Sequence, residues 1–142
     1  MIEDFIRWIK TNGYGSSIPT DAEQLINLSM LDLSKKKLRE LPESIGALKN
    51  LQILKLSSNR LKELPESICN LKKLKNLQCE NNLLEELPQN IGELESLIVC
   101  NLNGNRLYSL PKSFYNLRKL TRLTIAANSL EYLSEDLKNL NK

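Results

Sequence analysis

Apolar and polar positions repeat along this chain with a period of 23 residues from Leu28 onward. The unit that begins at Leu51, LQILKLSSNRLKELPESICNLKK, shows the shared pattern LxxLxLxxNxLxxLPxxIxxLxx. Each unit carries one apolar face that only a neighbouring unit can bury, so the pattern predicts a stacked solenoid. Stepping by 23 residues gives five units, at 28–50, 51–73, 74–96, 97–119 and 120–142.

Two kinds of element are expected within each unit. Apolar and polar residues alternate in the LxL segment, which indicates a short strand with one buried side. The LPxxIxxL segment spaces its apolar residues by three and four, which predicts a helical or 3₁₀ turn on the opposite side. Between them an asparagine amide can satisfy backbone groups that have left the sheet. This predicted asparagine ladder comprises Asn59, Asn82, Asn105 and Asn128, and Lys36 takes its place in the first unit.

The pattern over residues 28–142 resembles the leucine-rich-repeat family, in its intracellular-type 23-residue class with the LPxxI half-repeat. The resemblance implies an α/β fold, a right-handed solenoid with a short parallel sheet on its concave side. It also implies a protein-binding function, because similar proteins include Ras-pathway scaffolds and bacterial proteins. A signalling scaffold and a bacterial effector or adaptor are therefore both expected. Abundant Lys, Asn and Ile with scarce Gly favour a bacterial source.

Residues 1–27 are expected to form an N-terminal helical cap. Ile2, Phe5, Ile6 and Ile9 fall on one face of an amphipathic helix, which Asn12-Gly13 can end. Residues 18–27, IPTDAEQLIN, align with the convex half of a unit and make a truncated half-repeat. The alternative is a helix that binds a membrane or a partner.

The C-terminal end shows no distinct capping segment. In the fifth unit Ser134 replaces the proline, and the convex half SEDLKNLNK is polar. Either this polar unit is itself the cap, or the strand near Leu123–Ile125 is an exposed sheet edge. We therefore expect a monomer, with an end-to-end dimer and a self-associating building block as the alternative.

Composition and charge narrow the class of protein. The 20 Lys and Arg against 17 Asp and Glu give a net charge of +3, and the charges are mixed along the chain, which does not favour nucleic-acid binding. The chain shows no apolar run of about 18 residues and no secretory signal pattern. These features predict a cytoplasmic protein without a membrane span, although non-classical export to a host stays open.

The sequence contains no recognisable constellation of catalytic residues. The chain has no histidine, no P-loop and no GxGxxG motif, so we expect no enzyme activity, no cofactor and no metal. The carboxylate pair Glu85-Glu86 sits at an exposed phase and is interpreted as solvated charge. Of the three cysteines, Cys79 and Cys100 replace core leucines and Cys69 is expected to be partly exposed; all three are expected as free thiols.

The outward phases of the five strands are the candidate partner-binding site, on the concave face. Five strands with about five outward positions each give roughly the 20–30 residues of an ordinary protein interface. The residues Met30, Ile53 and Val99 are expected to make an apolar ridge, and Lys37, Arg60 and Arg106 a broken basic edge. This pattern predicts a protein partner that offers an apolar strip beside acidic groups. The full candidate set is Met30, Asp32, Lys37, Ile53, Lys55, Arg60, Gln78, Glu80, Val99, Asn101, Arg106 and Arg122.

Overall fold

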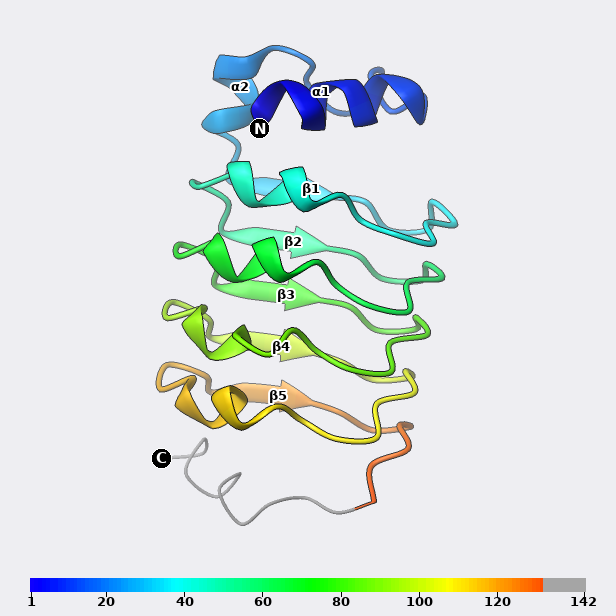
Figure 1. Ribbon diagram of the computed structural model, residues 1–142, viewed down its shortest axis with the longest axis vertical. Coiled ribbons are helices and arrows are strands. Elements are labelled where there is room, and N and C mark those ends of the chain that lie inside the picture. Colours follow the sequence, from blue (N-terminus) through cyan, green and yellow to red (C-terminus); the bar gives the residue numbers. More distant parts are fainter. Residues whose placement is uncertain (132–142) are drawn as a thin grey trace.

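In a computed structural model, which describes residues 1–131, the repeats stack into an open solenoid with one strand each (Figure 1). All strands are parallel and lie in a single sheet in chain order, β1-β2-β3-β4-β5. This arrangement confirms the predicted fold class, a leucine-rich-repeat solenoid with a short parallel sheet. The strands are β1 (Met30–Asp32), β2 (Ile53–Lys55), β3 (Asn76–Gln78), β4 (Val99–Asn101) and β5 (Arg122–Thr124).

The register of the sheet aligns equivalent residues of successive repeats. In β1 to β4 the middle residue of each strand points into the core and its two neighbours point outward. Leu54 and Leu77 are fully buried at this position, and Cys100 replaces leucine there in β4. Because each repeat packs equivalent residues against the next, apolar burial extends from β1 to β4.

Short 3₁₀ helices line the side opposite the sheet, as the spacing of the LPxxI segment predicts. A proline with extended backbone precedes three of them; Pro65, for example, has φ −65° and ψ 145°. The fixed φ of proline suits this entry into a helical turn, and its carbonyl accepts the first i→i+3 hydrogen bond, from Ile68 at 3.1 Å. These helices are η1 (Glu43–Ala47), η2 (Glu66–Asn70), η3 (Ile91–Glu93) and η4 (Lys112–Asn116).

The predicted asparagine ladder is present and joins neighbouring repeats. The Asn82 side-chain oxygen accepts a hydrogen bond from the Leu61 N–H at 3.1 Å, in the preceding repeat. Its amide nitrogen donates to the Leu56 carbonyl at 2.9 Å and to the Cys79 carbonyl at 3.1 Å. Asn59, Asn105 and Asn128 make equivalent bonds. The ladder therefore satisfies backbone groups that the turn removes from the sheet.

The first repeat lacks its own asparagine and takes these bonds from the second. Asn59 accepts from both the Lys36 and Leu38 N–H groups at 3.0 Å. In every repeat the residue just before the ladder position has a positive φ, and in the first repeat this residue is Lys35. The first repeat has a second such residue, Lys37, with a φ of 58°. A residue without an amide is thus accommodated by backbone strain in one turn.

We expect Asn82→Ala to lower the free energy of unfolding by about 1–3 kcal/mol, because it leaves buried backbone groups of two repeats unpaired. Urea denaturation followed by circular dichroism would measure the change. The exposed Asn70 on η2 makes no side-chain hydrogen bond within residues 1–131, so Asn70→Ala is the matched control. Equal midpoints for the two variants would contradict a ladder role for Asn82.

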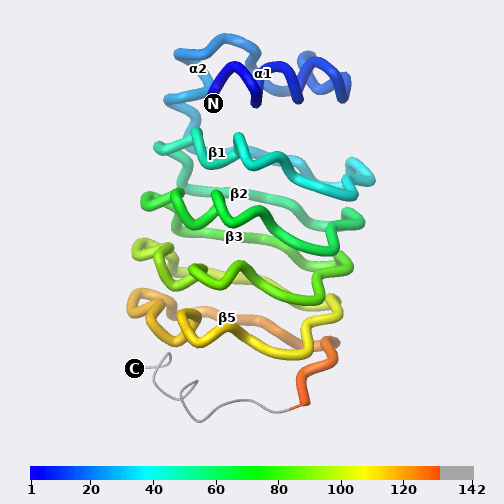
Figure 2. The backbone as a smooth tube through the Cα atoms, in the orientation of Figure 1, coloured from blue at the N-terminus to red at the C-terminus, as the bar shows by residue number. Residues whose placement is uncertain are grey.

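An N-terminal pair of helices covers one end of the stack (Figure 2). Helix α1 (Ile2–Thr11) buries Phe5 and Ile9 completely, on the predicted apolar face. Helix α2 (Ala22–Ile26) begins after Asp21, whose carboxylate accepts the Gln24 N–H at 2.9 Å, as an N-cap does. α1 packs against η1, so its apolar face is buried in the protein rather than presented to a membrane or partner.

The predictions about a polar last repeat and its Ser134 lie outside the described residues. Within the described part, Leu123 and Ile125 of the fifth repeat are half-buried, whereas their counterparts in the second repeat, Leu54 and Leu56, are fully buried. None of the helices in residues 1–131 is both long and apolar enough to cross a membrane.

Candidate protein-binding surface

The outward face of the sheet, the predicted concave face, carries its side chains in parallel rows. We define the first row by the first residue of each strand and the second row by the third. A third row follows two residues later, and an edge row lies just after the asparagine ladder. The first row is Met30, Ile53, Asn76, Val99 and Arg122; the edge row is Lys37, Arg60, Leu83, Arg106 and Ser129.

All twelve candidate site residues lie within the described part of the chain, in these four rows. The members that are exposed to solvent are Met30, Asp32, Lys37, Arg60, Arg106 and Arg122. The members that are half-buried among their neighbours are Ile53, Lys55, Gln78, Glu80, Val99 and Asn101. Met30 is the most unusual, because it is an apolar side chain that is 48 % exposed on a sheet face.

The register shows how continuous the apolar ridge is. Met30 lies beside Ile53, but Asn76 lies between Ile53 and Val99. The ridge therefore consists of a pair and a separate third member. Asn76 was not in the candidate set, although its place at an outward phase was a signal that the pattern contained.

Fixed polar groups occupy the middle of the face. The Asp32 carboxylate accepts the Ser34 N–H at 2.9 Å, and this bond is the main cause that lowers the pKa of Asp32, with Lys55 a smaller one. The Asn101 side-chain oxygen accepts from the Asn103 N–H at 3.2 Å and from the Thr124 hydroxyl at 2.7 Å. These bonds hold side chains of the second row in one orientation in the free protein.

Two acceptors on β3 and just beyond it are shielded from solvent and make no hydrogen bond within the described residues. They are Oδ1 of Asn76 and Oε2 of Glu80. Shielded polar atoms without a partner are uncommon in folded proteins, because leaving one unpaired costs about 1–3 kcal/mol. The centre of the face thus has unmet acceptor capacity.

The basic edge is exposed and unpaired. Ion pairs among residues 1–131 involve only the N-terminal segment and the Lys72–Glu93 pair, so Lys37, Arg60 and Arg106 have no acidic partner there. Leu83, half-buried, interrupts the row between Arg60 and Arg106. The edge therefore carries three cations that form no direct ion pair within residues 1–131.

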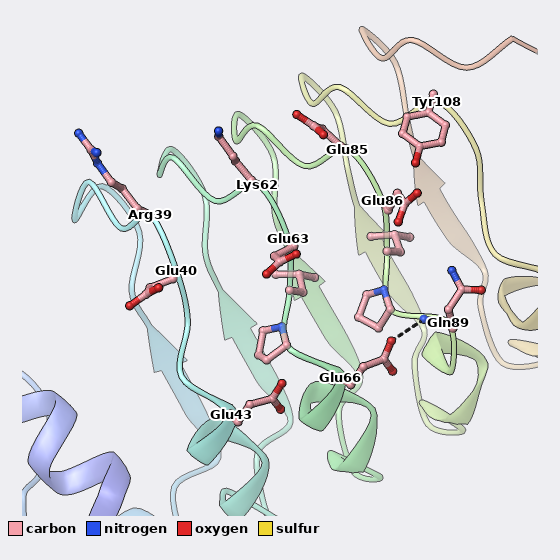
Figure 3. Close-up of a pocket in the computed structure, with 14 residues that line it drawn as sticks. Arg39, Glu40, Glu43, Lys62, Glu63, Glu66, Glu85, Glu86, Gln89 and Tyr108 are labelled. Carbon is pink, nitrogen blue, oxygen red and sulfur yellow. Dashed lines mark hydrogen bonds between the residues drawn. The ribbon is translucent and has the colours of Figure 1, made fainter.

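A second feature, which the sequence analysis did not anticipate, is an acidic groove of about 720 Å³ on the flank between the edge row and the 3₁₀ helices (Figure 3). Glu43 and Glu66 have a structural role in it: they accept the Ser67 N–H at 3.0 Å and the Gln89 N–H at 2.8 Å, each in the next repeat. The other acidic side chains that line it are Glu40, Glu63, Glu85 and Glu86. In residues 1–131 no group of three acidic or cysteine side chains is arranged to hold a metal ion.

The three cysteines are all buried as free thiols, so the prediction that Cys69 is partly exposed is wrong. Cys69, on η2, is 3 % exposed and belongs to the buried core cluster. Burial raises the pKa of the Cys69 and Cys100 thiols to about 12 and that of Cys79 well above its ordinary value. At neutral pH the nucleophilic thiolate is therefore scarce.

We expect the folded protein to resist thiol reagents at pH 8, and all three cysteines to react once it is unfolded in guanidinium. The reason is that both access and ionisation are suppressed by burial. Mass spectrometry after iodoacetamide treatment would count the modified sites. Rapid labelling of Cys69 in the native state, at the rate of a small free thiol, would show that its side chain reaches solvent.

Comparisons with known proteins agree on the family. The family model described as a leucine-rich repeat region matches residues 10–84, more than half of the chain, and the chain therefore belongs to the leucine-rich repeat family. A leucine-rich repeat protein of Leptospira interrogans is similar in structure, with a TM-score of 0.76 and 36 % identity over 87 % of this chain. The chain covers 37 % of that protein.

Two further solved structures share the fold. The BIR2 ectodomain of Arabidopsis thaliana matches 72 % of this chain with a TM-score of 0.62 and 34 % identity, and 56 % of its own length is covered. The leucine-rich repeat domain of APL1B matches 79 % of the chain at 22 % identity, with a TM-score of 0.71, and 35 % of its length is covered. The chain thus spans less than two thirds of each of these structures. A comparison with curated protein sequences finds no match.

Proposed function

We propose that this chain is a protein-protein interaction module that binds its partner on the concave face. Leucine-rich repeat proteins generally act as interaction modules, and they do so without catalysis. The observation that carries the proposal is that exposed Met30 and the unpaired basic edge belong to the rows of the same sheet face. The partner that suits this face offers an apolar strip beside acidic groups.

The finer role that we propose is a signalling scaffold or a bacterial effector or adaptor that acts in the cytoplasm or, after non-classical export, in a host. We propose a protein and not a nucleic acid as the partner, because apolar and acidic side chains lie among the cations of the face. The domain plan that accompanies this role is a cap at 1–27 followed by five repeats at 28–142.

Charge reversal on the edge tests the proposal. We expect Arg60→Glu combined with Arg106→Glu to abolish capture of the partner from the cell of origin, since like charges at an interface rim repel. Both side chains are exposed, so the fold should be unaffected, and circular dichroism would verify this. The matched control is Lys49→Glu with Arg118→Glu, the same charge change on the convex side. Unaltered capture by the edge variant would refute the concave-face site.

A self-associating building block is the second candidate, through the edge of the sheet at the C-terminal end. It is supported by the half-buried Leu123 and Ile125 of the last described repeat. A molar mass that rises with concentration would favour self-association, and a constant monomer mass would favour the interaction module.

A further inference from the structure

The polarity across the concave face reverses at one repeat. In repeats one, two and four an apolar residue of the first row is matched by a cation of the edge row, as Ile53 is by Arg60. In repeat three the order is opposite, because Asn76 stands in the first row and Leu83 in the edge row. A partner complementary to this face must carry the same reversal at the same place.

The spacing of these groups follows from the register. Neighbouring strands lie about 4.8 Å apart, so successive members of a row are separated by roughly that distance. Lys37 and Arg60 are one repeat apart, Arg60 and Arg106 two repeats apart, and Leu83 occupies the repeat between the latter pair. Measured along the solenoid, the three cations therefore lie at roughly 0, 5 and 14 Å, with Leu83 near 10 Å.

An α-helix laid along the solenoid, across the strands, matches this spacing. Three residues of helix rise about 4.5 Å, seven about 10.5 Å and ten about 15 Å, and positions i, i+3, i+7 and i+10 share one stripe of the helix. An extended segment rises about 6.6 Å between side chains of the same face, which does not match the repeat. Moreover, the backbone groups of the sheet are used between its strands, whereas a helix satisfies its own.

We propose that the concave face binds an amphipathic α-helix of the partner, laid across β1 to β4, with acidic residues at i, i+3 and i+10 against Lys37, Arg60 and Arg106. The i+7 position of this stripe is apolar and packs on Leu83. If the helix runs in the opposite direction, the acidic positions are i, i+7 and i+10 and the apolar position is i+3. This inference rests on the proposed function and specifies the partner's binding element.

The adjacent stripe of the same helix faces the first row. It is apolar opposite Met30, Ile53 and Val99, and polar opposite Asn76. At that position a polar side chain of the partner contacts Asn76, whose Oδ1 is itself shielded from solvent, as is Oε2 of Glu80 further along the same repeat. Strand positions from the first to the third row span about 13 Å, enough for a helix about 10–12 Å in diameter. The edge row lies three residues further along the chain, so its long lysine and arginine side chains reach back to the helix.

A displayed library of random 16-residue peptides, selected on the whole chain, tests the inference. We expect enriched sequences with acidic residues at i, i+3 and i+10 and an apolar residue at i+7, or the reversed order. A synthetic copy of an enriched peptide should bind Arg60→Glu with Arg106→Glu at least tenfold more weakly, and Leu83→Asp about tenfold more weakly. Binding to Lys49→Glu with Arg118→Glu should stay within twofold.

Helical binding is tested with the same synthetic peptide. A proline at a central position that faces away from the chain should weaken binding at least tenfold, because it breaks the helix without removing a contact. Enrichment of acidic residues at every second position, absence of any acidic spacing, or tolerance of the proline would each overturn the helix. Capture from cells can depend on Arg60 and Arg106 even when the peptide results contradict a helix. In that case the proposal of a helical partner is wrong, and the proposal of a concave-face site is retained. If capture is independent of both arginines, the two proposals fail together.

Discussion

A Phe5→Ala variant is expected to lose about 3–5 kcal/mol of folding free energy, the usual cost of removing a fully buried aromatic ring. Phe5 is completely inaccessible, and its ring stacks on Trp8 with centroids 5.5 Å apart. It belongs to α1, which packs against the first 3₁₀ helix η1. The cost is large because no later repeat can replace the apolar cover that α1 gives to the first one.

Urea denaturation would give the stability change, and native-state hydrogen exchange would give its location. Because repeats stabilise mainly their neighbours, the loss of protection of backbone amides from hydrogen exchange should be largest at β1 and smallest at β4. Arg7→Ala is the control, since its exposed side chain lies on the same helix. A stability loss below about 1 kcal/mol for Phe5→Ala would mean that α1 is not part of the core.

Gly92→Ala should destabilise the chain by about 3 kcal/mol or more, at the upper end of what an added methyl group costs in a tightly packed site. A Cβ at Gly92 would overlap the backbone carbonyl oxygen of Ser113 in the next repeat. The Gly92 N–H also donates to the Ser113 hydroxyl at 3.0 Å, so η3 and η4 are held close together there. A backbone oxygen cannot move aside as a flexible side chain could.

Thermal and urea unfolding of Gly92→Ala can be compared with Gly15→Ala. The Cβ at residue 15 would meet only the Thr20 methyl group at 3.5 Å, an ordinary contact, so that control should remain near wild-type stability. Gly46→Ala should resemble Gly92→Ala, because its Cβ would lie 2.8 Å from both the Ser67 Cβ and the Ser67 carbonyl oxygen. Equal unfolding midpoints for the residue 92 and residue 15 variants would contradict the close approach of the helices.

The Gly92 prediction shows where sequence reasoning reaches its limit. Cys69 and Tyr115 occupy the same repeat position as Gly46 and Gly92, so the pattern alone suggests that the position tolerates any residue. The structure shows instead that this position faces the 3₁₀ helix of the next repeat. A side chain there requires that helix to lie further away or to be shorter. Consistent with this, the helix that follows Cys69, η3, spans three residues where the other three span five.

The same limit explains the error at Cys69 and the missed acidic groove. Both depend on how far apart the 3₁₀ helices of successive repeats lie, a distance that the period of the sequence does not contain. Glu43 and Glu66 look like solvated charges in the sequence, yet they bond backbone groups 23 to 24 residues further along. The concave rows, in contrast, could be written down in advance, because strand alternation assigns each residue to a face.

The sequence by itself determined the repeat, the strands, the asparagine ladder, the helical cap and the rows of the candidate face. It could do so because each of these features depends on local periodicity, and every repeat buries its apolar residues at the same positions. Only the tertiary structure decided which of those residues are buried, bonded or free. Asn76 interrupts the apolar ridge and Leu83 interrupts the basic edge only because the strands lie side by side. The distances between repeats then set which partner is complementary to the face.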